Sequence, residues 1–271
     1  VREDVEKVHA GLKVGEVVEV YGRMTAYRDT PYLSISLDSG RIVPLEEGAY
    51  NQKDFINETD RDRYSMMSEL KALADGVTNP GYRALLEAFF GDAELADRFA
   101  FMPASKLYHH AYIGGLLEHT LGVLKAARAI AQHYGGIDMD LLTTAAVLHD
   151  LGKLSEYRVT GIIDFSLEGN MLGQIYLTQR AVAGLMAKAG VDTTSVDMVK
   201  LMHVIISHHG TVEKGSFIKP MMPEAVILYH SDQLDSRTKA VIEVRDELAA
   251  NTEDDVAFAS RRDIGSNLYL R

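Results

Sequence analysis

The sequence predicts a mainly α-helical protein preceded by a small β module. Apolar residues recur with helical periodicity from about residue 62 almost to the end of the chain. Residues 14–43 instead form short runs of strand-forming residues, separated by turn-forming ones. A polar, acidic stretch at 51–63 has no sustained period. We therefore expect a β module at 1–50, a linker at 51–63 and a helical domain at 64–271.

The composition restricts the class of protein. The chain has 271 residues, of which 46% are hydrophobic, so it can bury a full core. It has no cysteine, so any metal must be bound by His, Asp or Glu. A formal net charge of −11 argues against general electrostatic adhesion to nucleic acid.

The sequence has no membrane signal. No run of about 18 consecutive apolar residues occurs, and the acidic start is unlike a secretory signal. We therefore expect a soluble cytoplasmic protein without a membrane partner. The sequence leaves open whether it forms a homo-oligomer.

In the β module, three strands are expected within residues 14–21, 32–37 and 41–44. Turn residues separate them at 28–31 and 38–40. Three short strands rarely form a stable module, and the chain begins without methionine. We therefore expect the module to be incomplete, with its upstream strands missing.

Start signals and periodicity then predict a series of helices. Asn79 with Pro80, Ser195 and Pro223 are typical of helix starts. The expected helices cover roughly 62–75, 80–90, 92–100, 111–134, 139–151, 171–189, 195–209 and 223–250.

The helix expected at 139–151 ends in a His-Asp pair. Leu142, Ala145 and Ala146 lie on the same helical face as His149, so this imidazole is expected to point inward. Asp150 beside it would be a buried acid that needs a cation or hydrogen-bond donors. Gly152 is expected just after the helix end, in a left-handed conformation.

Three further helices place ligand-type side chains on apolar faces. His119 shares its face with Leu116 and Val123, His208 and His209 end another apolar stripe, and Asp232 interrupts a third. Any one of these could be a core residue bonded to backbone. Four helices with the same feature instead indicate one shared metal site. Its N and O donors favour Mn²⁺, Fe²⁺, Co²⁺, Mg²⁺ or Zn²⁺ without choosing among them.

The motifs resemble those of a known superfamily. They are Gly-Gly-Leu-Leu-Glu-His-Thr at 114–120, Leu-His-Asp-Leu-Gly-Lys at 148–153, Ser-His-His-Gly at 207–210 and His-Ser-Asp at 230–232. This series resembles the HD superfamily of metal-dependent phosphohydrolases. It is more closely similar to the YhaM-type 3′-to-5′ exoribonucleases, which join an OB-fold to an HD domain. The resemblance runs from about Val14 to Asp235 and implies an HD-type helical bundle after a partial OB-like module.

The resemblance also implies a ligand set. One ion, most plausibly Mn²⁺, would be bound by His119, His149, Asp150 and Asp232; a second would share Asp150 and use His208 and His209. The chain departs from the family pattern at Gln174, where a histidine usually binds the second ion. An amide oxygen is a weaker, neutral ligand, so we expect a depleted second site.

The implied reaction is attack of a metal-activated water on a phosphodiester at the 3′ end of single-stranded RNA, with DNA as a further substrate. The expected catalytic residues are Asp150 and Lys153, although a lysine there also suits a helix end. Lys106, His109 and His110 could contact the substrate or could be ordinary loop residues. We expect His9, His133, His203 and His230 not to be ligands.

Tyrosines and arginines in the β module suit stacking against single-stranded nucleic acid, but strand aromatics often only pack. Two other functions remain open. One is hydrolysis of free or cyclic nucleotides. The other is a weakly catalytic nucleic-acid-binding module with a structural metal.

Overall fold

The computed structural model describes residues 6, 10–35, 40–46, 48–249, 258–261 and 266–269. The chain divides into two compact units: one contains residues 1–57 and 158–164, and the other contains 58–157 and 165–271. Each unit is described here by itself.

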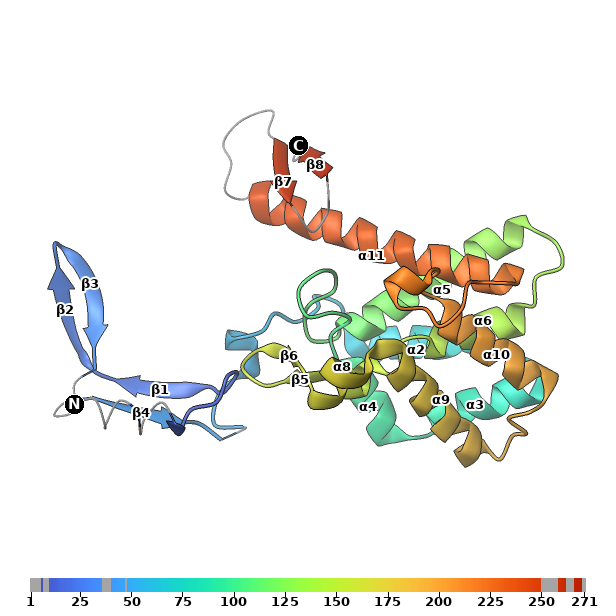
Figure 1. The fold of residues 1–271 in the computed structure, drawn as a ribbon, viewed down its shortest axis with the longest axis horizontal. Coiled ribbons are helices and arrows are strands. Elements are labelled where there is room, and N and C mark those ends of the chain that lie inside the picture. Colours follow the sequence, from blue (N-terminus) through green and yellow to red (C-terminus); the bar gives the residue numbers. More distant parts are fainter. Residues whose placement is uncertain are drawn as a thin grey trace. The chain divides into compact units, whose positions relative to one another are not determined.

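The first unit contains two antiparallel strand pairs (Figure 1). Its strands are β1 (Val18–Tyr21), β2 (Arg23–Tyr27), β3 (Thr30–Ser34) and β4 (Arg41–Pro44). β1 pairs with β4, and β2 pairs with β3. Arg28 and Asp29 connect β2 to β3 with φ angles of 49° and 65°, as a tight hairpin turn requires.

The structure changes the expected strands in two ways. β2 was not expected, and β3 begins at Thr30, a residue assigned to a turn from the sequence. The hairpin explains both, because only its two central residues leave the ladder. The expected strand residues 36–37 and turn residues 38–39 lie outside the described residues.

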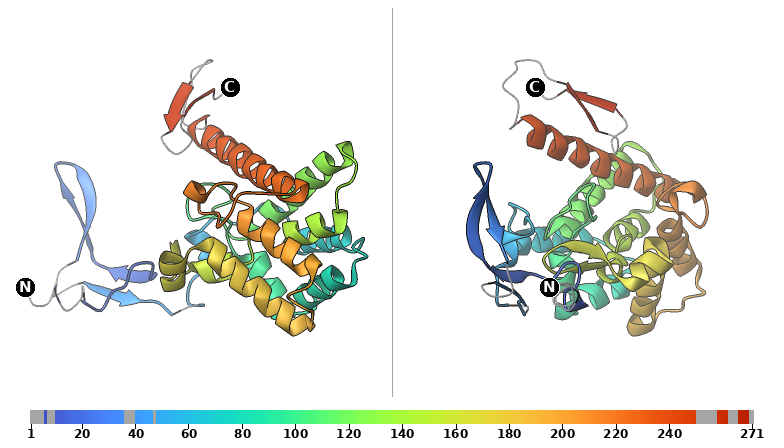
Figure 2. Two further views of the ribbon diagram at one scale, coloured as in Figure 1. Left: turned by 45° about the vertical axis from the view of Figure 1, so that its right-hand side comes forward. Right: turned by 60° about the vertical axis from the view of Figure 1, so that its left-hand side comes forward.

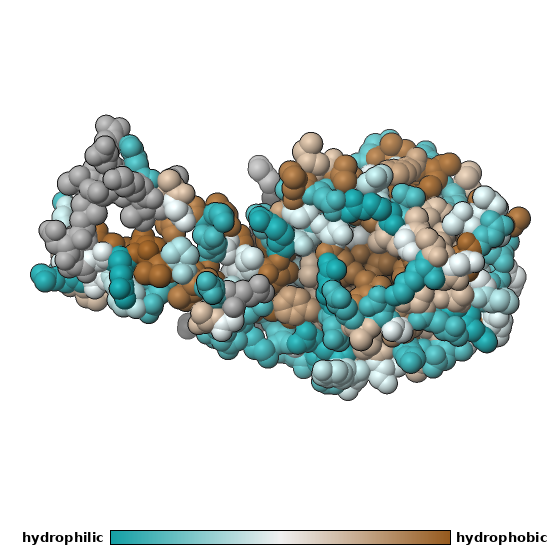
Figure 3. Space-filling model, turned by 90° about the horizontal axis from the view of Figure 1, so that it is seen from below, coloured by the Kyte–Doolittle hydropathy of each residue, from teal (hydrophilic) through white to brown (hydrophobic). Residues whose placement is uncertain are grey.

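Many large apolar side chains of this unit are exposed. Figure 3 shows apolar surface among polar residues over the strands. Tyr27 and Met24 are each 65% exposed, and Tyr32 is 48% exposed. The guanidinium of Arg41 lies 4.1 Å from the ring centre of Tyr21. The unit therefore offers aromatic faces to the solvent, some of them beside arginine.

The second unit is helical, as expected. Its longer helices are α2 (Arg63–Ala74), α3 (Pro80–Phe90), α4 (Ala93–Phe101), α5 (Gly115–His133), α6 (Met139–Leu148), α9 (Gln174–Ala189), α10 (Val196–Ser207) and α11 (Pro223–Ala249). The predicted start signals are confirmed: Asn79 and Ser195 cap α3 and α10 with their side chains, and Pro223 begins α11.

Helix α5 lies at the centre of this unit. It packs against α2, α4, α6 and α11, and α10 packs against α6, α9 and α11 (Figures 1 and 2). Leu116, Leu121 and Leu124 of α5 are fully buried. Every residue from Leu141 to Leu148 of α6 is at most 1% exposed. The helices of this core carry the side chains that the sequence predicts to bind metal.

Some expected helices are shorter or divided. The helix expected at 139–151 ends at Leu148, and a short helix α7 (Lys153–Glu156) follows. The helix expected at 171–189 is interrupted at Gly173, which has a φ of 75° between α8 (Leu167–Leu172) and α9. The helix expected from 111 begins only at Gly115.

The prediction of a left-handed Gly152 was wrong. Its φ and ψ are −64° and −21°, which any residue adopts. A glycine is needed for another reason, because a Cβ there would lie 2.2 Å from the backbone nitrogen of Thr178. Gly152 therefore allows α9 to approach the His-Asp segment closely.

Two hairpins were not expected from the sequence. One consists of β5 (Tyr157–Val159) and β6 (Ile163–Phe165), most of which belongs to the first unit. The other consists of β7 (Phe258–Arg261) and β8 (Ser266–Tyr269), in which Leu268 packs with Val244 of α11. Among the described residues, no helix is both long enough and apolar enough to cross a membrane.

Candidate metal centre

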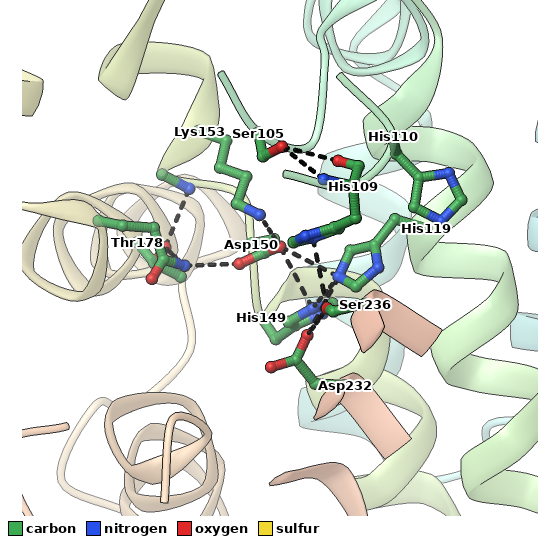
Figure 4. A network of polar contacts seen from close by, with 12 residues as sticks. Ser105, His109, His110, His119, His149, Asp150, Lys153, Thr178, Asp232 and Ser236 are labelled. Atoms are coloured by element: carbon green, nitrogen blue, oxygen red, sulfur yellow. Dashed lines mark hydrogen bonds and ion pairs between the residues drawn. The ribbon is translucent and has the colours of Figure 1, made fainter. Parts of the chain in front are cut away.

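Five of the predicted ligands, contributed by four helices, come together. His119 lies in α5, His149 and Asp150 follow α6, His208 follows α10, and Asp232 lies in α11. His119, His149 and His208 are fully buried, and Asp150 and Asp232 are 2% and 7% exposed. Figure 4 shows His119, His149, Asp150 and Asp232 pointing toward a common point.

The distances between these side chains suit one bound ion. His119 Nε2 lies 3.4 Å from His149 Nε2, 3.4 Å from Asp150 Oδ2 and 3.3 Å from Asp232 Oδ1. Donor atoms bound about 2.1 Å from one ion lie roughly 3.0 to 3.4 Å apart. The donor atoms of His119, His149 and Asp232 all lie within 4.8 Å of one another, as one divalent cation requires. Asp150 Oδ2 lies 3.4 Å from both imidazoles and is also paired with Lys153.

The imidazoles are oriented as metal ligands. His149 Nδ1 donates to the carbonyl of Ala146 at 2.8 Å, and His208 Nδ1 donates to the carbonyl of Ile205 at 2.6 Å. Since a carbonyl only accepts, the proton is on Nδ1 and the Nε2 lone pair is available. Metal-binding histidines commonly use their second nitrogen in this way. His208 Nε2 is buried without a hydrogen-bond partner.

Negative charge is concentrated at the centre. Burial would lower the pKa of His119, yet hydrogen bonds with Asp150, Asp232 and Asp235 raise it well above its ordinary value. Burial lowers the pKa of His149 to about 4, so its ring is neutral. Two buried carboxylates, Asp150 and Asp232, with Asp235 beside them, form an anionic environment that a divalent cation would neutralise.

The residues expected around a second ion lie near the other oxygen of Asp150. His208 Nε2 is 3.6 Å from Asp150 Oδ1, and Gln174 Nε2 donates to the same oxygen at 2.5 Å. Gln174 Oε1 is buried without a hydrogen-bond partner. His209 is farther out: its Nδ1 donates to the carbonyl of Lys214 at 3.1 Å, and its ring lines the adjoining pocket.

That pocket opens from the centre and measures about 280 Å³. Besides Asp150 and Asp232, its lining residues are polar or aromatic: Tyr108, His109, Lys153, His209, Lys214, Gln233, Ser236 and Arg237. Arg237 makes no hydrogen bond or ion pair within the described part of the chain. Cationic side chains therefore surround the opening to an anionic centre.

The predicted catalytic lysine is buried in the centre. Lys153 is 7% exposed, and its Nζ lies 2.6 Å from Asp150 Oδ2. Burial would lower its pKa, but Asp150 raises it above the ordinary value, so the ammonium stays charged.

The three residues predicted to contact the substrate are placed differently. Figure 4 shows the ring of His109 turned toward Lys153 and Asp150, whereas His110 lies on the other side of His119. Burial lowers the pKa of His109 to about 2, so it is neutral. His110 is 3% exposed and bonds to Asp235 and Tyr112. Lys106 Nζ lies 5.7 Å from the ring centre of Phe165 and does not line the pocket.

Sequence reasoning missed Asp235. Its Oδ2 lies 2.7 Å from His119 Nδ1 and 3.0 Å from His110 Nε2. One signal was present: Asp235 follows Asp232 by three residues, so both lie on one helical face.

Comparison with known proteins agrees with this geometry. Residues 116–237 match the model of the HD domain. The chain is 30% identical to the 3′-5′ exoribonuclease YhaM of Bacillus pumilus over 222 residues, which cover 82% of this chain and 68% of the relative. The chain belongs to the YhaM family. The residues that match the HD domain include all the predicted metal ligands, from His119 to Asp232, whereas His109 and His110 precede them.

Other YhaM proteins give the same result. Identity is 31% to the Bacillus subtilis protein, covering 82% of this chain and 68% of that one. It is 29% to the Listeria welshimeri protein, covering 85% and 71%. Both relatives are named 3′-5′ exoribonuclease YhaM. No solved structure matches the chain significantly.

Proposed function

We propose that the chain is a metal-dependent 3′-to-5′ exonuclease that hydrolyses phosphodiester bonds of single-stranded RNA, and of DNA as a secondary substrate. The observation that carries this is the convergence of His119, His149, Asp150 and Asp232 at metal-ligand spacing. The YhaM relatives are named as 3′-5′ exoribonucleases, which supports the substrate class and the direction.

We propose Mn²⁺ as the ion, bound by His119, His149, Asp150 and Asp232. When bound there, the ion would lower the pKa of a water molecule and neutralise charge on the phosphate. The position beside His208, His209 and Asp150 would bind a second ion weakly, because Gln174 already donates a hydrogen bond to Asp150 Oδ1.

The chain's own residues supply the remaining chemistry. Lys153 holds Asp150 in an ionised state, and its charge lies at the pocket wall, where negative charge develops on the phosphate. His109 is neutral, and its Nε2 lies 3.3 Å from Ser236 Oγ, so its ring would contact the phosphate as an uncharged hydrogen-bonding group. Lys214 and Arg237 would bind phosphates of the strand.

The first unit would bind the strand. Tyr21, Tyr27 and Tyr32 are exposed, and the arginines at 23, 28 and 41 belong to the same small unit. Aromatic faces beside cations suit stacking of successive bases without sequence preference.

The cytoplasmic location and the homo-oligomer stay predictions.

The test compares substrates on the purified chain with Mn²⁺. A 5′-labelled single-stranded RNA should shorten stepwise from its 3′ end, and EDTA should stop the reaction. A panel of free and cyclic nucleotides should be hydrolysed far more slowly. Faster hydrolysis of the nucleotides than of RNA would overturn the proposal in favour of a nucleotide phosphohydrolase.

A further inference from the structure

A polar cluster lies behind His119, on the side away from the pocket. One oxygen of Asp235, Oδ2, accepts from His119 Nδ1 at 2.7 Å and from His110 Nε2 at 3.0 Å. Both imidazoles are almost completely buried, at 0% and 3% exposure. An ionised carboxylate only accepts, so each ring turns an N–H toward it. His119 therefore keeps its Nε2 for the centre.

The fold makes room for this carboxylate. Gly122 lies one turn after His119 in α5, and a Cβ at this position would lie 2.0 Å from Asp235 Oδ1. α5 and α11 can therefore approach closely enough for the 2.7 Å bond only because residue 122 has no side chain.

His110 is held in place at a conformational cost. Its φ is 47°, in the left-handed region that residues other than glycine seldom adopt. Its Nδ1 lies 2.8 Å from the hydroxyl of Tyr112, which bonds to Glu118 at 3.0 Å. Strained backbone that is fixed by several contacts is common at functional sites.

These three side chains could instead be a separate metal site, since their donor atoms lie within 4.8 Å of one another. The distances argue against it. Donors bound about 2.1 Å from one ion stay roughly 3.0 Å or more apart. The 2.7 Å between His119 and Asp235 is a hydrogen-bond length.

We propose that Asp235, held by His110 and admitted by Gly122, is a positioning residue that fixes the ring of His119 with Nε2 toward the metal. The carboxylate also makes the imidazole a stronger ligand. This inference rests on the proposed metal centre. It assigns His110 to the support of a ligand and not to the substrate.

The test measures Mn²⁺ affinity of the full chain after metal removal, from the electron paramagnetic resonance signal of free Mn²⁺. Asp235→Asn should weaken binding roughly 10- to 100-fold. Gly122→Ala changes no polar group yet should weaken binding by displacing the carboxylate. His110→Asn should weaken it less, because asparagine tolerates a positive φ. Asp246→Asn, an exposed position on the same helix, is the matched control.

A second measurement separates positioning from mere folding. Excess Mn²⁺ should restore RNA hydrolysis to Asp235→Asn but not to Asp232→Asn, which lacks a ligand. Unchanged Mn²⁺ affinity in Asp235→Asn, or activity that excess Mn²⁺ does not restore, would overturn the positioning role. If Asp235→Asn binds one Mn²⁺ fewer per chain while the site at His119, His149, Asp150 and Asp232 stays filled, Asp235 binds a separate ion, and the positioning role is also overturned. No Mn²⁺ binding by the unmodified chain would instead contradict the metal centre itself.

Discussion

Replacing Asp150 by alanine should destabilise the protein as well as inactivate it. Asp150 and Lys153 are 2% and 7% exposed, and their charged atoms lie 2.6 Å apart. Removing one partner of a buried ion pair leaves an uncompensated charge, which costs about 3 to 5 kcal/mol. At about 2 to 4 °C per kcal/mol for a domain of this size, Asp150→Ala should unfold roughly 6 to 20 °C lower.

The double variant Asp150→Ala with Lys153→Met separates the two effects. Replacing a buried ion pair by apolar groups often changes stability little. The double variant should therefore melt close to the unmodified chain, well above Asp150→Ala. RNA hydrolysis should stay absent, because the ligand is still missing. Calorimetry in EDTA gives the stability without a contribution from metal, and Asp246→Ala is an exposed control.

Two results would refute this reasoning. An Asp150→Ala chain that melts within a few degrees of the unmodified chain would show that Lys153 is not trapped as a buried charge. A double variant with full metal content and full hydrolysis would show that Asp150 is not a ligand.

Three further predictions concern Gln174, Glu156 and the direction of cleavage. Gln174→His should raise the Mn²⁺ stoichiometry at limiting metal and lower the Mn²⁺ concentration for half-maximal hydrolysis, whereas identical titration curves would mean that Gln174 only packs. Burial raises the pKa of Glu156 from 4.5 to about 7, so the folded chain retains this proton and stability falls as pH rises between those values. Glu156→Gln should therefore raise the melting temperature in EDTA at about pH 8 and hardly at all at about pH 5; an equal gain at both would contradict this assignment. A 3′-phosphate on the RNA should slow the first cleavage while a 5′ label survives to short products, and early release of labelled 5′ mononucleotide would exclude this direction.

The sequence predicted those parts of the site that are local in the chain. His149 faces inward because Leu142, Ala145 and Ala146 define the buried face of its helix, and the structure places it there. The same reasoning located His119 and Asp232 on buried faces. The helix positions followed from periodicity and capping residues, so most helix starts agree within a few residues.

The partners of these side chains could not be predicted, because they come from distant segments. The bond from His119 to Asp235 joins residues 116 positions apart, and Gly152 is explained only by Thr178 of another helix. The strands of the β5–β6 and β7–β8 hairpins have only three or four residues each, too few for a local pattern to indicate a strand. Their existence depends on tertiary packing that a local pattern does not contain.

The most direct test of the account is the position of the ion in crystals of the chain grown with Mn²⁺, located by anomalous diffraction. The account predicts one strong peak bound by His119, His149, Asp150 and Asp232, at about 2.0 to 2.2 Å from their donor atoms. It predicts at most a weaker peak between His208 and Asp150. No peak among the four residues, or a stronger one beside Asp235 and His110, would contradict it.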